Sequence, residues 1–321
     1  GWRPGDNLFS NSIVALDVRT GERVWHFQTV HHDLWDSENV GAPILGDITV
    51  DGRRIKALMQ ANKNTFLFVL DRTTGEPVWP IEERPVPQST VPGERTSPTQ
   101  PYPTKPPAYD RQGVSLDDLV DFTPEIRTRA EAIAARHRIG PIFTPISVSD
   151  PDGVIATLML PSAGGGTNWP GGSIDPETGI AYLYSFTNIT ALGLINDPER
   201  SDMNFIRGRA RGISAADAAL NIDGIPLVKP PWGRITAIDL TRGEHAWQIP
   251  NGGGIRDHAA LRGLDLPPLG IASRPVALVT ATLLFIGEGG NVFGGIQANM
   301  WGSVFRAYDK ATGSVVWETD L

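Results

Sequence analysis

Polar and ionisable side chains are concentrated in the segment that runs from Gln28 to Asp36, Gln-Thr-Val-His-His-Asp-Leu-Trp-Asp. A carboxylate here could act as a general base, and a His-His-Asp cluster could ligate zinc or iron. His31 and His32 are adjacent, and adjacent side chains of an extended segment point to opposite faces, which disfavours their binding one metal ion. We expect both imidazoles to be partly buried and hydrogen-bonded, with metal ligation as the alternative.

A second candidate, Lys63, follows Asp36 by 27 residues and lies directly before the apolar run Phe66–Leu70. A lone lysine at the start of a strand is usually solvated. A fixed ammonium can instead stabilise negative charge that develops on a substrate or cofactor. The sequence around Lys63 alone does not separate these two interpretations.

A third candidate is the glycine-rich stretch Gly164-Gly165-Gly166-Thr167-Asn168-Trp169-Pro170. By composition it is a turn-rich connection, because glycine adopts backbone conformations that other residues disfavour. Asn168 could hydrogen-bond a ligand there. For Trp169, packing in the core explains the residue as well as a functional role does.

The elements that must position these residues belong to a repeat, apolar-x-apolar-Asp-x-x-(Thr or Arg)-Gly-x-x-x-Trp. The Asp accepts backbone hydrogen bonds in a tight turn, the Gly takes positive φ, and a second strand carries the Trp on its buried face. Each copy therefore predicts a β-hairpin. Four copies end at Trp25, Trp79, Trp247 and Trp317, and a weaker copy around Asp175 and Gly179 continues into Tyr182-Leu183.

Hairpins that each carry one large buried aromatic residue are typical of an all-β fold with radially arranged blades, a β-propeller. The repeats are spaced more widely than a bare blade of about 40–50 residues requires, which predicts insertions. We expect residues 1–321 to form one partial propeller domain, with an insertion at 80–140 between blades. Within it, Pro80–Pro107 is predicted as an extended surface excursion.

A helix is predicted after that excursion. Thr123 suits the N-cap, Pro124 the first turn, and Gly140 the stop. Ile126, Ala130 and Ile133 would share its buried face. A second short helix is expected to begin at Ser214.

Composition limits the classes of function. The formal net charge is −8, so nucleic-acid binding and attraction to an anionic membrane surface are not expected. The longest apolar candidate, Pro275–Gly287, falls short of the roughly 20 residues that a spanning helix requires. The absence of Cys excludes disulfides and thiolate chemistry.

Taken together, the His-His-Asp-Leu-Trp-Asp string that ends at Asp36, the downstream Lys63 and the Val-Leu-Asp-Arg-x-x-Gly strand at 69–75 resemble the PQQ-dependent dehydrogenases. This is the family of membrane-type glucose dehydrogenase and of methanol and ethanol dehydrogenases. The stretch Arg95–Pro101 is also similar to that family. The resemblance implies an oxidoreductase on an eight-bladed propeller, of which the repeats here account for about four to five blades.

The resemblance also implies roles for individual residues. Asp36 matches the general base, which also binds the Ca²⁺ or Mg²⁺ ion, and Lys63 matches the residue that hydrogen-bonds the quinone oxygens of PQQ. Asn168 and Trp169 match a loop that borders the quinone. The implied substrate is a small alcohol or sugar, with a membrane quinone or cytochrome c as electron acceptor. The implied location is the periplasm, soluble or anchored to the inner membrane.

Both ends of the chain are expected to be truncated relative to this family. Other metal ligands, contacts to the PQQ carboxylates and an export signal or membrane anchor would precede Gly1, so full activity from this polypeptide alone is not expected. The alternative is a non-catalytic propeller scaffold of the outer-membrane assembly type. Such a scaffold would show the repeats without Asp36, Lys63 and Asn168 in a common arrangement.

Overall fold

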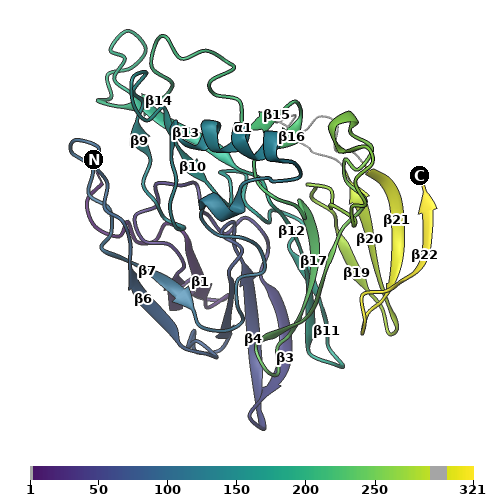
Figure 1. Cartoon of the computed structure of the whole chain (residues 1–321). Coiled ribbons are helices and arrows are strands. Elements are labelled where there is room, and N and C mark those ends of the chain that lie inside the picture. Colours follow the sequence, from purple (N-terminus) through teal and green to yellow (C-terminus); the bar gives the residue numbers. More distant parts are fainter. Residues whose placement is uncertain (1–2, 290–301) are drawn as a thin grey trace.

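The computed structural model describes residues 3–289 and 302–321, which fold mainly as β-strands arranged in a series of sheets side by side (Figure 1). Gly1, where the expected truncation begins, lies outside the described residues. No helix in the described ranges has the length and apolar character needed to cross a bilayer.

Four antiparallel sheets carry the repeats. The first is the hairpin of β1 (Ser12–Leu16) and β2 (Arg23–Gln28). The second consists of β3 (Ile44–Val50), β4 (Arg53–Ala61) and β5 (Leu67–Asp71). The third has the order β11 (Gly172–Asp175), β12 (Ile180–Phe186), β17 (Gly233–Asp239) and β18 (Glu244–Pro250). The fourth has the order β19 (Ala277–Val279), β20 (Leu283–Gly289), β21 (Gly302–Asp309) and β22 (Val315–Asp320).

The third sheet lies next to the second and the fourth, because β11 contacts both β3 and β19. Between the second and third sheets, Ala57, Met59 and Val69 pack with Leu183 and Ile238 in one buried cluster. The core thus lies between the blades, as a propeller requires.

The predicted turn chemistry is confirmed. In every copy the Asp Oδ1 accepts from the backbone N–H two residues on, and the Gly has positive φ; Gly21, for example, has φ +73°. Four copies form hairpins. The copy at Asp71 does not continue into a paired strand, and only an isolated bridge joins Leu70 to Pro77. Pairing continues as far as the Val78 N–H, which donates to the Val69 carbonyl at 2.9 Å, and Pro80 then has no N–H with which to extend a ladder.

The repeat tryptophans connect successive sheets. Trp25 donates from Nε1 to the carbonyl oxygen of Arg72, 3.1 Å away, and its ring lies against Gly75. Trp247 donates in the same way to Lys310, also at 3.1 Å. The predicted burial is wrong for Trp317, which is 50% exposed because no repeat turn within the described residues covers its ring.

The predicted helix is present as α1 (Pro124–Ala134), with Thr123 as its N-cap. The predicted stop at Gly140 is wrong, because the helix ends six residues earlier and the chain pairs as β8 (His137–Arg138) with β10 (Ala156–Met159). Ile126 and Ala130 face the core as expected.

The helix predicted at Ser214 is also wrong. The Ser214 hydroxyl donates to Asp217 Oδ2 and accepts from the Asp217 N–H, which forms a turn. The Ala219 N–H then donates to the Ala216 carbonyl at 3.1 Å. These local side-chain bonds compete with helix propagation.

Residues 80–107 form an antiparallel ribbon of β6 (Ile81–Pro85) and β7 (Thr99–Pro103). The ribbon is tied to the segment that follows β2, because Gln100 Oε1 accepts from His31 N–H at 2.8 Å and Gln100 Nε2 donates to the His31 carbonyl at 2.6 Å. β13 (Thr190–Ile195) pairs antiparallel with β10. The remaining elements are short: β9 (Ser147–Val148), β14 (Ile206–Arg207), β15 (Asn221–Ile222), β16 (Ile225–Pro226) and two 3₁₀ turns, Leu116–Asp118 and Ala259–Leu261.

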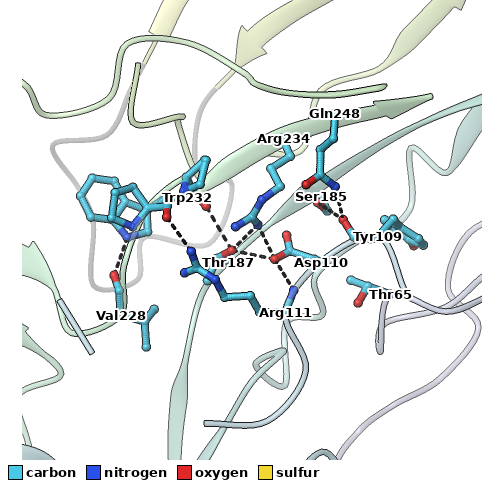
Figure 2. A network of polar contacts seen from close by, with 12 residues as sticks. Thr65, Tyr109, Asp110, Arg111, Ser185, Thr187, Val228, Trp232, Arg234 and Gln248 are labelled. Carbon is cyan, nitrogen blue, oxygen red and sulfur yellow. Dashed lines mark hydrogen bonds and ion pairs between the residues drawn. The ribbon is translucent and has the colours of Figure 1, made fainter. Parts of the chain in front are cut away.

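A buried polar network joins the segment after this ribbon to the third sheet (Figure 2). Asp110 forms an ion pair with Arg234, and both side chains are at most 5% exposed. The Thr187 hydroxyl donates to Asp110 Oδ1 at 2.7 Å. Thr187 lies between Phe186 and Asn188, so the network fixes the end of β12.

We predict that Trp25→Ala destabilises the fold by about 3–5 kcal/mol, because it opens a cavity between two sheets and removes the bond to Arg72. Trp317→Ala, the matched control, should cost about 1 kcal/mol or less, since that ring is 50% exposed. Denaturant midpoints measure both. Equal losses for the two variants would contradict the role given to Trp25.

Candidate active site

The four residues singled out in the sequence, Asp36, Lys63, Asn168 and Trp169, line one cleft of about 580 Å³. They come from the segment after β2, the turn after β4 and the loop before β11. The structure therefore brings together side chains that are far apart in the sequence.

Lys63 is the centre of the charged part of this cleft. Its Nζ lies 3.0 Å from Oδ2 of Asp36 and 2.9 Å from Oε2 of Glu38. The Lys63 side chain is only 7% exposed, whereas those of Asp36 and Glu38 are 61% and 40% exposed. A buried ammonium is thus presented to the cleft between two accessible carboxylates.

Backbone hydrogen bonds fix the position of Lys63. Thr65 N–H donates to the Asn62 carbonyl at 2.9 Å and closes a tight turn after β4. The Lys63 carbonyl accepts from Gly166 N–H at 2.8 Å, which joins the turn to the glycine-rich loop.

Asp33 holds the segment that carries Asp36. Its Oδ1 accepts from Trp35 N–H and its Oδ2 from Ser37 N–H, both at 2.8 Å. Trp35 is buried and donates from Nε1 to the Thr144 carbonyl at 2.8 Å. Asp36 itself has φ +63°, a left-handed conformation that Asp and Asn tolerate better than most residues. The string thus turns the Asp36 carboxylate out of the core.

The imidazoles of His31 and His32 are hydrogen-bonded through both ring nitrogens, as predicted. The His31 ring lies 2.7 Å from Gln28 Oε1 and 3.0 Å from Glu83 Oε1. The His32 ring lies 2.8 Å from the Gly5 carbonyl and 2.8 Å from Glu94 Oε1. Their role is therefore to hold the chain that leads to the cleft.

The glycine-rich loop is folded around Asn168. Its Nδ2 donates to the Gly164 carbonyl at 2.8 Å, and its backbone N–H donates to the Tyr184 hydroxyl at 2.8 Å. Trp169 is 72% exposed, so the interpretation of this residue as core packing is wrong. The exposed ring leaves Trp169 accessible to a ligand in the cleft.

Sequence reasoning missed Glu38, Asn188, Arg207 and Arg274, which line the same cleft. Glu38 could have been found, because it is an ionisable residue only two positions after Asp36, which was already identified. Burial raises the pKa of the Glu38 carboxyl, and the Lys63 ammonium opposes that shift. The two arginines come from segments with no recognisable pattern.

The donor set suits a hard divalent cation only in part. Ca²⁺ takes six to eight oxygen ligands, and Asp36 and Glu38 supply two carboxylates. Within residues 3–289 and 302–321, no group of three or more His, Asp or Glu side chains is arranged to hold a metal ion. Further oxygen ligands would have to come from the cofactor or from residues other than these.

Gly165 is the position where loop and lysine are closest. It has φ +81°, and an added Cβ would lie 2.6 Å from Lys63 Cγ and would also clash with the Thr167 carbonyl oxygen. We predict that Gly165→Ala displaces Lys63 and weakens ligand binding in the cleft. Gly93→Ala is the matched control, since Gly93 has φ +83° but nothing within 4 Å of an added Cβ.

In the intact enzyme, titration of each variant with PQQ, the ligand that the family resemblance implies, measures this effect through tryptophan fluorescence. Both substitutions strain the backbone, so both should lower the melting temperature, whereas only Gly165→Ala should lower affinity. Unchanged affinity in Gly165→Ala would contradict the proposed packing of loop on lysine.

Comparison with known proteins places this chain in a family. The family model described as "PQQ: Glucose/ethanol/alcohol dehydrogenase, beta-propeller domain" matches residues 1–321. The chain is 33% identical to the glycerol dehydrogenase large subunit of Gluconobacter oxydans (strain 621H), over 99% of this chain and 44% of that protein. It is also 33% identical to the quinoprotein glucose dehydrogenase of the same strain, over 98% of this chain and 40% of that protein.

Among solved structures, the quinohemoprotein alcohol dehydrogenase of Pseudomonas putida HK5 matches with a TM-score of 0.54 and 22% identity, over 98% of this chain and 36% of that one. The β-propeller prediction is confirmed. The chain spans less than half the length of the curated relatives. On the match over its whole length, this chain belongs to the PQQ-dependent glucose, ethanol and alcohol dehydrogenase family of β-propeller domains.

Proposed function

We propose that this chain is part of a PQQ-dependent dehydrogenase that oxidises an alcohol or a sugar, with Asp36 as the general base. The single observation that carries the proposal is the buried Lys63 ammonium, held between Asp36 and Glu38 at the wall of a cleft that Asn168 and Trp169 also line. A scaffold that only binds other proteins has no need of such an arrangement.

The cleft suits a planar, anionic quinone. Lys63, Arg207 and Arg274 provide positive charge, the Asn168 amide provides hydrogen-bonding groups, and the Trp169 indole provides an exposed flat surface. Because residues outside this chain would complete the site, these side chains account for one wall of it.

PQQ, held beside Lys63 and Asn168, would supply the hydride acceptor for oxidation of the carbon that bears the hydroxyl group. Asp36 lies on the accessible side of the cleft and would take the hydroxyl proton onto its carboxylate. Lys63 would donate hydrogen bonds to the oxygen on which negative charge grows. Asp36 and Glu38 would also bind a Ca²⁺ or Mg²⁺ ion, whose charge supports the same change.

The relatives suggest the range of substrates, since those named above act on glycerol, glucose and alcohols. We propose a small polyol, sugar or alcohol, with a membrane quinone or a cytochrome c as electron acceptor. The same relationship supports a periplasmic location, either soluble or anchored to the inner membrane.

We predict that Asp36→Asn in the intact enzyme keeps PQQ bound and lowers turnover by about 10²–10⁴, the usual contribution of a general base. Asn tolerates the φ of +63° at this position, so the backbone should be preserved. Asp51→Asn is the control, because Asp51 also has positive φ, +50°, in the exposed turn between β3 and β4. Dye-linked alcohol oxidation measures turnover, and parental rates in PQQ-loaded Asp36→Asn would refute the assignment.

We predict that Lys63→Ala raises the dissociation constant for PQQ by about tenfold or more, as expected for loss of a hydrogen bond from a charged group. The fold should survive, because Asp36 and Glu38 are 61% and 40% exposed and remain solvated. Lys63→Arg should have a smaller effect, since the charge is kept. Calorimetric titration with PQQ tests both variants; an Ala variant that binds like the parent would exclude this role.

A further inference from the structure

Two arginines line the cleft together with Asp36 and Lys63. Arg207 is the last residue of β14 and is exposed, whereas Arg274 precedes β19 and is half-buried. Lys63 contacts the two carboxylates of the cleft, Asp36 and Glu38. The arginines therefore give the rest of the lining a positive charge, in a chain whose formal net charge is −8.

Contacts with Gly164 and Phe186 help to hold the guanidinium of Arg274 in place. Its Nη2 donates to the Gly164 carbonyl at 3.0 Å, and its Cζ lies 5.6 Å from the centroid of the Phe186 ring. Asn168 Nδ2 donates to the same Gly164 oxygen at 2.8 Å. Because they share one acceptor, the Arg274 guanidinium and the Asn168 amide lie side by side at the cleft.

The chemistry of this pair favours an anionic ligand. A guanidinium stays charged in proteins and presents five N–H donors in a planar fork that matches a carboxylate. Burial lowers the pKa of Arg274, yet the group remains cationic at neutral pH. A side chain already held by a ring and a carbonyl loses little conformational freedom when it binds.

We propose that Arg274 is a ligand-binding residue that takes a carboxylate of the molecule held in this cleft. The carboxylate could come from PQQ, which is a tricarboxylic acid, or from an acidic substrate such as a hydroxy acid. The inference rests on the proposed function for the identity of these ligands and adds a charged subsite to it.

The test compares charged and neutral forms of each ligand in the intact enzyme. Arg274→Gln removes the charge, and Arg209→Gln is the matched control, since Arg209 is an exposed arginine that lines a different cleft. One arm titrates the apoenzyme with PQQ and with its trimethyl ester, and measures binding by fluorescence. The other arm compares KM for a hydroxy acid with KM for a neutral alcohol.

If the carboxylate belongs to PQQ, Arg274→Gln should raise the Kd of PQQ about tenfold or more and leave the Kd of the ester unchanged. If it belongs to the substrate, only the KM of the hydroxy acid should rise by that factor. Arg209→Gln should change neither the Kd of PQQ nor the KM of the hydroxy acid.

If Arg274→Gln weakened binding of the charged and the neutral ligands by the same factor, Arg274 would only support the Gly164 loop, and the proposal would be overturned. Unchanged Kd and KM values in both arms would also overturn the proposal. A parent enzyme that binds PQQ through Arg274 but oxidises no alcohol would refute the proposed function alone.

Discussion

Burial of the Lys63 ammonium is the constraint on which the site depends. Removing an ammonium from water costs several kcal/mol unless opposite charges and hydrogen bonds replace its hydration. Asp36 and Glu38 supply that replacement at 3.0 and 2.9 Å, so the segment that carries them must be held in position. This requirement explains why so many neighbouring backbone groups are fixed by side-chain bonds, such as those of Asp33.

The blades supply that rigidity because they are connected to one another. Trp25 and Trp247 each extend from one repeat to the turn of another, where the indole N–H finds a backbone carbonyl and the ring packs on glycine. Asp36 and Lys63 follow strands of two different sheets. Their separation is thus set by how those sheets pack, and not by the loops alone.

The sequence could predict what depends on local pattern. The Asp of each repeat accepts backbone hydrogen bonds and the Gly takes positive φ, so both residues determine a turn locally. The resemblance of the string that ends at Asp36 to a known family identified the candidate site. Features that depend on packing could not be predicted. The exposure of Trp317, the early end of α1 and the place of Arg274 are decided by neighbours from distant segments.

Two residues between β6 and α1, Gln100 and Asp110, show how this packing reaches the cleft from both sides. Gln100, on β7, bonds both backbone groups of His31 in the segment that leads to Asp36. Asp110, a few residues later, bonds Thr187 and Arg234 behind Phe186, whose ring supports Arg274. A segment that the sequence predicts as a surface excursion, together with the residues after it, therefore connects the segment that carries Asp36 to the part of the cleft that contains Arg274. Because Asp110 and Arg234 are buried as a pair, loss of either would leave a buried charge next to that wall.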